Sequence, residues 1–563
     1  RLVRRMVGAT ERDSAGHLRE KLETVVGGIS GEEETEVRPV FASLFGLQGE
    51  AGQPPLEGEA FKGRLFIVMK RLLRHHASQR PAILVFDDMH WADPASVGLL
   101  LHLMPLTEQI PLLLLWAMRP ERQAPGWGAK LTAETDYGHR YTEILLRPLN
   151  QAESGNLVDS LLTISDLPPP LRARILEKTE GNPFFVEEVI RTLVEGGIVT
   201  RDETGGHWQA TGTGDTIEIP GNVRALLTAR IDRLDAGARR TLQLASIIGR
   251  AFYYRVLSRV AGVARALDGQ LQTLERAELI RETVRLPELE YLFRHALTQE
   301  AAYSTILLKS RRTYHRQVGE ALELLYPEQR GELAVNLAGH FYAARDYEKA
   351  LDYYTDAGDG AFRLHASAEA VEHYSRAIAC AGQVGASSER LIHLYIQRGR
   401  AYELSSRFDE ALSNYQELER TADEHGDRAL ELASMTAQSI LRATQTSLYN
   451  PRKARKLSEK ALLLSQELGD RAVEAKVLWG LMILESWSGD DPDMALAYGE
   501  GSLDIARELA LKEQMAYTLT NLVGANLALN RFEAANRAIL ESRALWLELG
   551  NAPMLADSYG LVG

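Results

Sequence analysis

The sequence predicts a multidomain protein with an α/β core, two small mainly helical domains of which the second is winged-helix-like, and an all-α superhelix of repeats. Three observations lead to this prediction. Two apolar runs of strand length flank a helical pattern within the first 150 residues. A mainly helical stretch with one turn-rich insert follows. From about residue 332 onward, a short helical phrase returns at a nearly constant interval.

The length of 563 residues is too great for one hydrophobic core. From the changes in pattern, residues 1–150 are expected to form the α/β core and residues 151–215 the small helical domain. Residues 216–330 are expected to form the winged-helix-like domain, and residues 331–563 the repeats.

The overall composition argues against a general nucleic-acid or membrane binder. The formal net charge is −13, and 45% of the residues are hydrophobic. The longest strongly apolar run, residues 110–118, is about half as long as a membrane span requires. The single cysteine, Cys380, has no partner for an internal disulfide and is expected to be a small buried residue of a helix. We therefore expect a cytoplasmic protein without a membrane span.

The two ends of the chain predict a fragment of a longer protein. The sequence begins at Arg1 rather than at a methionine, and it ends within a helical pattern that has no stop signal.

The first two apolar runs predict a parallel strand–helix–strand unit. "AILVF" (82–86) and "LLLLWAM" (112–118) are separated by a helix-like segment. The continuous apolar character of these runs predicts a sheet that is covered on both faces. Asp93 followed by Pro94 has the pattern of an N-cap with proline at the first helical position.

Charged residues stand at the ends of both predicted strands. Asp87 and Asp88 follow the first strand, and Arg119 follows the second. Ligands of α/β folds bind at the carboxyl ends of parallel strands, so these side chains are candidates for one site. Asp87 would hold Mg²⁺, Asp88 would polarise an attacking water, and Arg119 would meet a γ-phosphate. The alternative is that two polar residues close one strand and a solvated arginine closes the other.

The next candidate motif lies in "EKTEGNPFFVEEVIRTLVE" (177–195). Gly181 is placed to end one helix, and Pro183 to begin the next. Helix punctuation is by itself a sufficient explanation of both residues. The turn-rich stretch at 199–215 predicts a hairpin-like insert.

The C-terminal region contains a repeated helical phrase. Examples are "YEKALDYY" (347–354), "FDEALSNY" (408–415) and "PDMALAY" (492–498). The aligned small residues are Ala350, Ala370, Ala411, Ala454, Ala495 and Ala535, and their later spacings are 41, 43, 41 and 40 residues. A fixed period of this length with a recurring small residue is typical of stacked helical hairpins, because alanine lets two helices approach closely. The region resembles tetratricopeptide repeats in a longer variant.

Four segments together resemble the AAA-type signal-transduction ATPases called STAND proteins. They occur in the family's order: "LVFDDMHWADPAS", "LLLLWAMRPE", "EGNPFFVEEVIRTLVEGGIV" and "FRHALTQEAAYSTIL". The resemblance is strongest to the branch associated with class III adenylate/guanylate cyclases, and the layout is similar to LuxR-type activators such as the maltose regulator. It implies a partial P-loop NTPase core, helical and winged-helix-like domains, and a tetratricopeptide-like superhelix.

The resemblance also implies roles for individual residues. Asp87 and Asp88 match the Walker B acids, and Arg119 matches the sensor arginine. Gly181 and Pro183 match a G-x-P motif whose proline packs on adenine. His295 matches a winged-helix histidine that senses the β-phosphate in the resting state, although an ordinary helical histidine is an equal explanation. The implied cofactors are ATP or ADP and Mg²⁺.

One element of the family pattern is absent from the sequence. No G-x-x-x-x-G-K-[S/T] phosphate loop occurs; the glycine-rich stretch at 25–35 has no lysine, and the segment at 59–66 has no glycine at the required distance upstream. Truncation explains this better than loss of the loop, because the Walker B acids remain. As given, the chain lacks the N–H cradle that holds the β- and γ-phosphates, and we expect it to bind ATP poorly.

Two functions follow from the resemblance, with a third as the alternative to both. The first is an ATP-binding switch in a cyclase-type signalling protein, whose full-length form is a slow Mg²⁺-dependent ATPase. The second is a LuxR-type transcriptional regulator that contacts DNA only through a domain outside this chain. The third is a repeat scaffold with an inactive ATPase core. In each case the repeats would bind a protein partner or a small ligand, and the resemblance also allows a nucleotide-driven oligomer.

Overall fold

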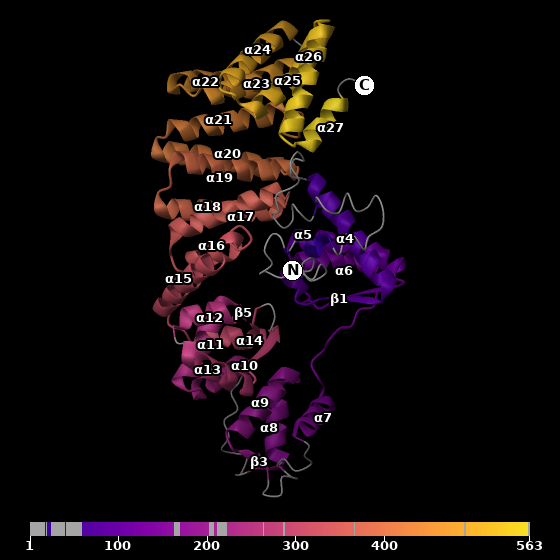
Figure 1. Ribbon diagram of the computed structural model, residues 1–563, viewed down its shortest axis with the longest axis vertical. Coiled ribbons are helices and arrows are strands. Elements are labelled where there is room, and N and C mark those ends of the chain that lie inside the picture. The colour runs from indigo at the N-terminus through magenta and orange to yellow at the C-terminus, as the bar shows by residue number, and fades with distance from the viewer. Residues whose placement is uncertain are drawn as a thin grey trace. The chain divides into compact units, whose positions relative to one another are not determined.

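The structure is a computed structural model of the chain (Figure 1). It describes residues 17, 20–23, 40, 59–162, 169–201, 208–210, 222–262, 264–284, 288–364, 366–488 and 491–560. The glycine-rich stretch at 25–35 lies outside the described residues. Two compact units are present. One consists of residues 1–139, 331–338 and 347–563, and the other of residues 140–330 and 339–346.

The first described elements form a small α/β arrangement. Helix α4 (Glu59–Gln79) precedes strand β1 (Ala82–Phe86), and helix α5 (Pro94–Leu103) precedes strand β2 (Leu112–Trp116). Two short 3₁₀ turns, η1 (Met89–Trp91) and η2 (Met104–Glu108), and helix α6 (Pro125–Asp136) complete it. The strands are parallel, in register from Ala82 opposite Leu112 to Phe86 opposite Trp116. The predicted strand–helix–strand unit is therefore confirmed.

The prediction that both faces of this sheet are covered was wrong for the described residues. One face, with Leu84, Leu112 and Leu114, packs against α4 and η2. On the other face, Ile83 and Val85 are 63% and 66% exposed, and Leu113 and Leu115 are about half exposed. The apolar run is continuous, but the side chains of a strand alternate between two environments, and here only one of the two is a packed core.

The first part of the second unit is a small helical bundle. Helices α7 (Gln151–Leu162), α8 (Pro169–Thr179) and α9 (Pro183–Glu195) share one apolar core. Strand β3 (Val199–Arg201) then pairs antiparallel with β4 (Trp208–Ala210). This pairing confirms the predicted hairpin.

The second part of this unit has a winged-helix-like arrangement of helices and a small sheet. Its elements are α10 (Val223–Arg233), α11 (Ala236–Ile248), β5 (Ala251–Tyr253), α12 (Tyr254–Ala261), α13 (Ala264–Arg276), β6 (Ile280–Val284), β7 (Glu290–Phe293), α14 (Ala296–Ser304) and α15 (Leu308–Leu325). The strands are antiparallel in the order β5–β7–β6, and their buried residues join one core with α10, α11, α12, α13 and α14. A 3₁₀ turn η4 (Pro327–Gln329) and helix α16 (Ala334–Ala343) follow.

The remaining helices are stacked one on the next (Figure 1). They are α17 (Tyr347–Arg363), α18 (Ser367–Val384), α19 (Ser388–Leu404), α20 (Phe408–His425), α21 (Arg428–Ala443), α22 (Pro451–Leu468), α23 (Arg471–Ser488), α24 (Pro492–Glu508), α25 (Lys512–Ala528), α26 (Phe532–Glu548) and α27 (Ala552–Gly560). Each helix packs against the next in sequence, as expected for stacked hairpins.

The recurring alanines lie at the contacts between these helices. Ala350, Ala370, Ala411, Ala454 and Ala495 have no exposed surface, and Ala535 is 3% exposed. All but Ala350 lie in the second helix of a hairpin, whereas Ala350 lies in the first helix of its hairpin, α17. This difference explains why only the later spacings are near 41 residues.

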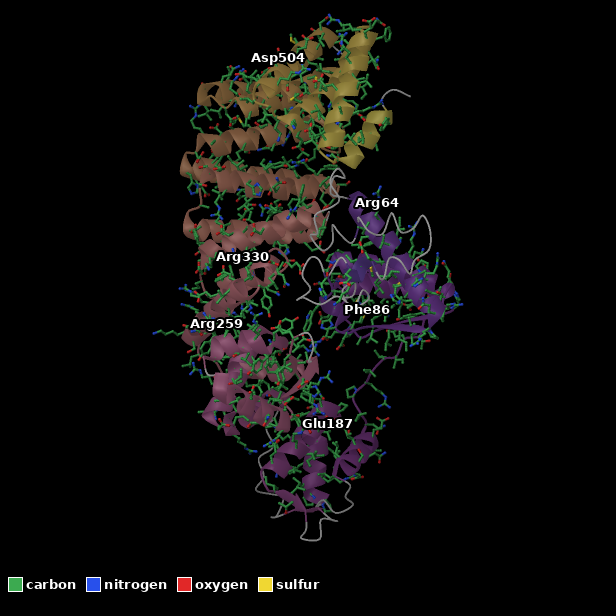
Figure 2. All side chains as sticks on the ribbon, in the orientation of Figure 1. Arg64, Phe86, Glu187, Arg259, Arg330 and Asp504 are labelled. Atoms are coloured by element: carbon green, nitrogen blue, oxygen red, sulfur yellow. The ribbon has the colours of Figure 1, made fainter. Side chains whose placement is uncertain are left out.

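The first helices of the hairpins also contact one another. α17, α19, α21, α23 and α25 each pack against the next member of this series. A layer whose successive members touch is the inner layer of a curved stack, so we call these five the inner helices. Side chains fill the spaces between the helices, and Asp504 is exposed on α24 (Figure 2).

The described part of the chain contains no helix that is both long enough and apolar enough to cross a membrane.

The repeat packing predicts the effect of enlarging Ala411. Ala411→Leu should cost roughly 1–3 kcal/mol of unfolding free energy, because the buried site has no space for three more carbons. Protection from hydrogen exchange should fall around residues 390–460 and remain unchanged around residues 83–119. Ala429→Leu is the control, because Ala429 is exposed near the start of α21. Equal loss of protection in both regions would indicate one cooperative globule and contradict the repeat architecture.

Candidate functional site

The three charged residues predicted at the strand ends lie along one rim of the sheet. β1 ends at Phe86 and β2 at Trp116, so Asp87 and Arg119 both follow the carboxyl ends of parallel, paired strands. The backbone holds the two ends together beyond the strands: Ala117 N donates to Phe86 O, and Met89 N donates to Ala117 O, both at 2.9 Å. Asp87 and Arg119 are exposed.

Asp88 has an unusual backbone conformation. Its φ of 58° lies in the left-handed region, which residues other than glycine seldom adopt, although aspartate tolerates it better than most. Its backbone N–H donates to Asp87 Oδ1 at 3.1 Å. Strain of this kind is more common at functional sites than elsewhere. The nearby cap is confirmed, since Asp93 Oδ1 accepts from Ser96 N at 2.7 Å and Pro94 begins α5.

The rim fits Mg²⁺ only as part of a shared coordination shell. Among the described residues no group of three His, Cys, Asp or Glu side chains is arranged to hold a metal ion. Mg²⁺, however, commonly takes one or two carboxylates from the protein and completes its shell with waters and phosphate oxygens. Exposed Asp87 can supply such a carboxylate when a phosphate-bearing ligand supplies the rest.

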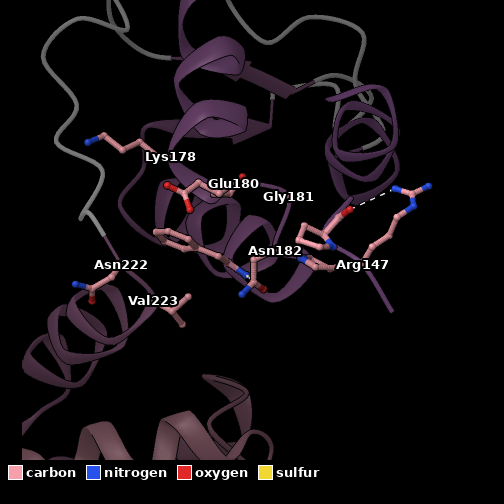
Figure 3. Close-up of a pocket in the computed structure, with 11 residues that line it drawn as sticks. Arg147, Lys178, Glu180, Gly181, Asn182, Asn222 and Val223 are labelled. Carbon is pink, nitrogen blue, oxygen red and sulfur yellow. Dashed lines mark hydrogen bonds between the residues drawn. The ribbon is translucent and has the colours of Figure 1, made fainter. Parts of the chain in front are cut away.

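The second candidate region is a pocket of about 530 Å³ in the second unit (Figure 3). The segments before α7, between α8 and α9, and before α10 form its walls. Its lining residues are Arg147, Pro148, Lys178, Thr179, Glu180, Gly181, Asn182, Pro183, Phe185, Asn222 and Val223. Two of the predicted site residues, Gly181 and Pro183, therefore lie in one pocket, and Pro183 is exposed there.

Two helix N-termini meet at this pocket. Asn182 caps α9 by accepting from Phe185 N at 3.2 Å, and Asn222 caps α10 by accepting from Ala225 N at 2.8 Å. Pro183 occupies the first position of α9, which confirms its predicted role as a helix start. Both helix dipoles direct their positive ends at the pocket, which favours a negatively charged or electron-rich ligand.

Two cationic side chains flank the pocket: Arg147, which is paired with a carboxylate, and Lys178, which is exposed. Arg147 makes two 2.8 Å hydrogen bonds to the carboxylate of Glu153, and these bonds lower the pKa of Glu153 to about 2. Arg147 also donates to Pro148 O at 3.3 Å (Figure 3). Its charge is therefore already balanced. Lys178 is exposed near the end of α8, and it points away from Arg147 in Figure 3.

Gly181 is required by the pocket wall. Its φ is +74°, and a Cβ at this position would lie 2.0 Å from the backbone oxygen of Leu149. Leu149 N donates to Gly181 O at 2.8 Å, so the chain before α7 lies directly against the turn before α9. Only glycine allows both the left-handed conformation and this close approach.

His295 lies beside the pocket helix without lining the pocket. It is the N-cap residue of α14, and its ring lies 4.0 Å, centroid to centroid, from the ring of Phe184 on α9. Burial lowers the pKa of His295, partly opposed by the carboxylates of Glu188 and Glu187. The imidazole of His295 is thus held neutral, and it lies next to Phe184, the residue that follows Pro183.

A buried arginine connects α9 to the winged-helix-like part. The Arg230 guanidinium, from α10, pairs with Glu188 and with Glu195, at 3.0 Å for the latter, and donates to Ala277 O at 2.7 Å. The side chains of Arg230 and Glu188 are 3% and 4% exposed. Glu188 and Glu195 are two turns apart on one face of α9, so a single guanidinium holds that face.

A second set of ion pairs supports this contact. Glu278 accepts from Arg191 of α9 at 2.5 Å and pairs with Arg294, the residue before His295. These side chains are partly exposed, so each pair contributes less than the buried one. Together the two sets join α9 to α10, to the end of α13 and to the start of α14.

Sequence reasoning missed several residues of this region. Arg147, Asn222 and Arg230 come from segments far from Gly181 in sequence, and only folding brings them together. Asn222 carried one usable signal, since asparagine before a helical pattern is typical of an N-cap. Arg230 carried none, because it stands among other arginines of α10 that are exposed.

Comparison with known families assigns two segments of the chain. Residues 1–116 match the family described as AAA ATPase domain, and residues 150–204 match a Domain of unknown function (DUF8739). The chain thus combines a segment similar to AAA ATPase domains with helical repeats.

Comparison with individual proteins finds two that are similar to this chain. An uncharacterized protein of Rhizobium meliloti (strain 1021) is 27% identical over 385 residues, which cover 64% of this chain and 34% of that protein. The chain therefore spans about a third of this curated relative. The crystal structure of a Signal Transduction ATPase with Numerous Domains (STAND) protein with a tetratricopeptide repeat sensor, from Pyrococcus horikoshii, matches with 15% identity and a TM-score of 0.34. That match covers 98% of this chain and 78% of that one.

The requirement for glycine at position 181 can be tested against a matched glycine. Gly181→Ala should cost more stability than Gly197→Ala, because both have positive φ but a Cβ at Gly197 would meet no atom within 4 Å. For the control we expect about 1 kcal/mol, the usual cost of a left-handed residue other than glycine. Thermal and urea unfolding of the two variants measure the difference, and equal losses would contradict the close approach of Leu149.

We predict that replacing the buried Arg230 causes a large loss of stability. Arg230→Met should cost about 3–5 kcal/mol, because it leaves the Glu188 carboxylate buried without its counter-ion. Arg224→Met, at an exposed position of the same helix, should stay within about 0.5 kcal/mol of the parent protein. Urea unfolding provides the measurement. A loss no larger than that of the control would mean that the ion pairs do not hold α9.

Proposed function

We propose that this chain is the nucleotide-responsive part of an ATP-dependent signal-transduction switch. The observation that carries the proposal is the pocket at the N-termini of α9 and α10, where the segment of Gly181 and Pro183 meets two other segments of the unit. The AAA ATPase match of residues 1–116 and the acidic sheet rim support it.

In this proposal the residues of the sheet rim contact the phosphates and their Mg²⁺. Asp87 supplies a carboxylate to Mg²⁺, and Asp88 orients the attacking water. Arg119, at the end of the paired strand, places a guanidinium beside the γ-phosphate. Their common position after the carboxyl ends of parallel strands supports these roles, because that edge is where α/β folds bind ligands.

The pocket of the second unit, considered by itself, suits the base of a nucleotide. Pro183 is exposed within it, and Pro148 and Val223 are further apolar lining groups that suit the flat faces of an adenine base. The two helix N-termini favour the electron-rich side of the ligand. ATP and ADP, with Mg²⁺, are therefore the proposed ligands.

The contacts of α9 suggest how a bound nucleotide is sensed. A ligand against Pro183 acts on the first turn of α9, where Phe184 stacks on His295. The buried Arg230 pairs connect the same helix to α10. A shift of α9 would therefore be transmitted to the winged-helix-like part. His295 would distinguish the ATP-bound state from the ADP-bound state.

The output of the switch is proposed from the resemblance of the sequence. A cyclase-type signalling protein is the favoured context, with a protein partner or small ligand received by the repeats and with nucleotide-driven oligomerisation as one consequence. The alternatives are a LuxR-type transcriptional regulator, which would reach DNA through another domain, and a repeat scaffold with an inactive core. All three place the pocket and the repeats in one chain.

The nucleoside pocket can be tested at Pro183. In the full-length protein, Pro183→Gly should weaken ATP and ADP binding several-fold, because it removes the apolar surface offered to the base. Pro451→Gly is a matched control, since Asn450 and Pro451 begin α22 in the same way as Asn182 and Pro183 begin α9. Calorimetric titration should show reduced affinity only for the first variant. Equal affinities, after correction for the folded fraction, would favour a role in helix punctuation alone.

The phosphate end can be tested at Asp87. In the full-length protein, Asp87→Ala should abolish Mg²⁺-dependent ATP turnover and leave the fold intact, because an exposed strand-end carboxylate contributes charge rather than packing. Asp136→Ala changes another exposed carboxylate and should keep parent activity. Phosphate release measures both variants. Unchanged turnover in Asp87→Ala would rule out its assignment as a magnesium ligand.

A further inference from the structure

Glu180 occupies an unusual turn in the wall of the pocket of the second unit. Asn182 N donates to Thr179 O at 2.9 Å, and the two residues between them, Glu180 and Gly181, have φ angles of +49° and +74°. Within the described part of the chain, no other two consecutive residues both have positive φ. A four-residue turn with this hydrogen bond and with positive φ at both central positions is a type I′ turn.

Glutamate is a poor residue for its position in this turn. The first central position of a type I′ turn favours asparagine, aspartate or glycine, because most other side chains are strained in the left-handed conformation. Gly181 meets the requirement at the second central position, whereas Glu180 does not meet it at the first. A residue that violates a local preference in the wall of a pocket is a candidate for a functional role. What glutamate adds here is a carboxylate on a longer side chain.

The carboxylate of Glu180 is accessible to a ligand. Glu180 is exposed, and it lines the cavity of about 530 Å³. Its side chain points away from Arg147, toward the side of the pocket on which Asn222 lies (Figure 3). None of the hydrogen bonds between the lining residues involves this carboxylate (Figure 3). A molecule in the pocket can therefore form hydrogen bonds with it directly.

The other oxygen-bearing side chains of the lining are already used. Asn182 and Asn222 each use the side-chain oxygen to cap the helix that they begin. Thr179 is buried, and its hydroxyl donates to a backbone oxygen of α8 at 2.8 Å. The carboxylate of Glu180 is therefore the main side-chain acceptor that the pocket offers to a ligand.

A carboxylate selects a ligand by its hydrogen-bond donors. An ionised carboxylate accepts through two oxygens and donates none. The positive helix ends at the pocket favour electron-rich groups, but a phosphate beside Glu180 would meet a like charge and be repelled. The part of a nucleotide that faces Glu180 is therefore its base or its sugar rather than its phosphates.

The sugar matches this carboxylate better than adenine does. On adenine, the donor of the amino group stands beside a ring nitrogen that is an acceptor, so one of the two carboxylate oxygens would face another acceptor. The vicinal hydroxyls of ribose provide two donors side by side. Dinucleotide-binding folds use the same chemistry, since an acidic side chain there accepts from the 2′-hydroxyl of ribose.

We propose that Glu180 is a specificity-determining residue, which accepts hydrogen bonds from the ribose hydroxyls of the bound nucleotide. This role rests on the proposed nucleotide function and adds to it the class of ligand that the pocket prefers, ribonucleotides over 2′-deoxyribonucleotides. Because Glu180 is exposed, water competes with the sugar for its carboxylate. The preference is therefore modest rather than absolute.

Calorimetric titration of the full-length protein with ADP and with 2′-deoxy-ADP measures this preference. We expect 2′-deoxy-ADP to bind roughly threefold to tenfold more weakly than ADP, which is the range for the loss of one hydrogen bond. Glu180→Ala should abolish the difference between the two ligands, because it removes the carboxylate. Glu177→Ala should keep the parent preference, because Glu177 is exposed in the last turn of α8 and does not line the pocket.

A second variant separates binding from folding. Glu180→Gly should also abolish the preference for ADP, yet it should unfold at the same temperature as the parent protein or higher, because glycine adopts the left-handed conformation without strain. Thermal unfolding without ligand measures this. A lower unfolding temperature would assign Glu180 to the stability of the turn rather than to a ligand.

Other results would also overturn the proposal. Equal binding of ADP and 2′-deoxy-ADP by the parent protein, or an unchanged preference in Glu180→Ala, would each contradict it. Guanine has two adjacent donors on one edge, so GDP that binds more tightly than ADP, with this advantage lost in Glu180→Ala, would assign the carboxylate to a base instead. ADP binding that depends on Pro183 but not on the 2′-hydroxyl would contradict this role alone, whereas absence of ADP binding would overturn the proposed function as well.

Discussion

The buried guanidinium of Arg230 is the interaction on which the second unit most depends. It joins two carboxylates of α9 to a backbone oxygen at the end of α13, and it does so almost without contact with water. A charge in this position is stable only while its partners stay in place. The spacing between α9 and α10 is therefore set by an ion pair. The pocket between the N-termini of these two helices depends on that spacing.

In the second unit, an ion pair sets the distance between α9 and α10. In the repeats, small residues set the distances between neighbouring helices. Ala411 and Ala454 have no exposed surface, and a Cβ at Gly399 would lie 2.4 Å from the ring of Tyr415. Close packing of this kind brings alternate helices into contact as well as neighbours. It also explains why Arg400 can reach Glu513 across the inner layer.

The two candidate ligand sites use different physical means for a related task. The pocket of the second unit offers helix N-termini, a proline face and a glycine without which its wall would clash. The sheet rim offers the exposed carboxylate of Asp87 and the exposed guanidinium of Arg119. The pocket favours an electron-rich ligand, and the rim suits a phosphate-bearing ligand together with Mg²⁺.

The sequence by itself determined the local elements and the recurrent architecture. The strand–helix–strand unit, the hairpin after α9, the cap at Asp93, the helix start at Pro183 and the stacked helices all follow from patterns that span a few residues or one repeat period. Such patterns are readable because neighbouring residues share one backbone conformation. Asp87, Asp88, Arg119, Gly181, Pro183 and His295 were selected in this way, by motif, and their functional roles stay predictions.

Only the tertiary structure decided which of these elements meet. It left Ile83 and Val85 on an exposed sheet face, it placed His295 against Phe184, and it selected Arg230 from several arginines of one helix. It also brought Arg400 of α19 to within 3.8 Å of Glu513 of α25. The physical reason is that burial and pairing depend on segments that approach one another only after the chain has closed, and no local pattern records that approach.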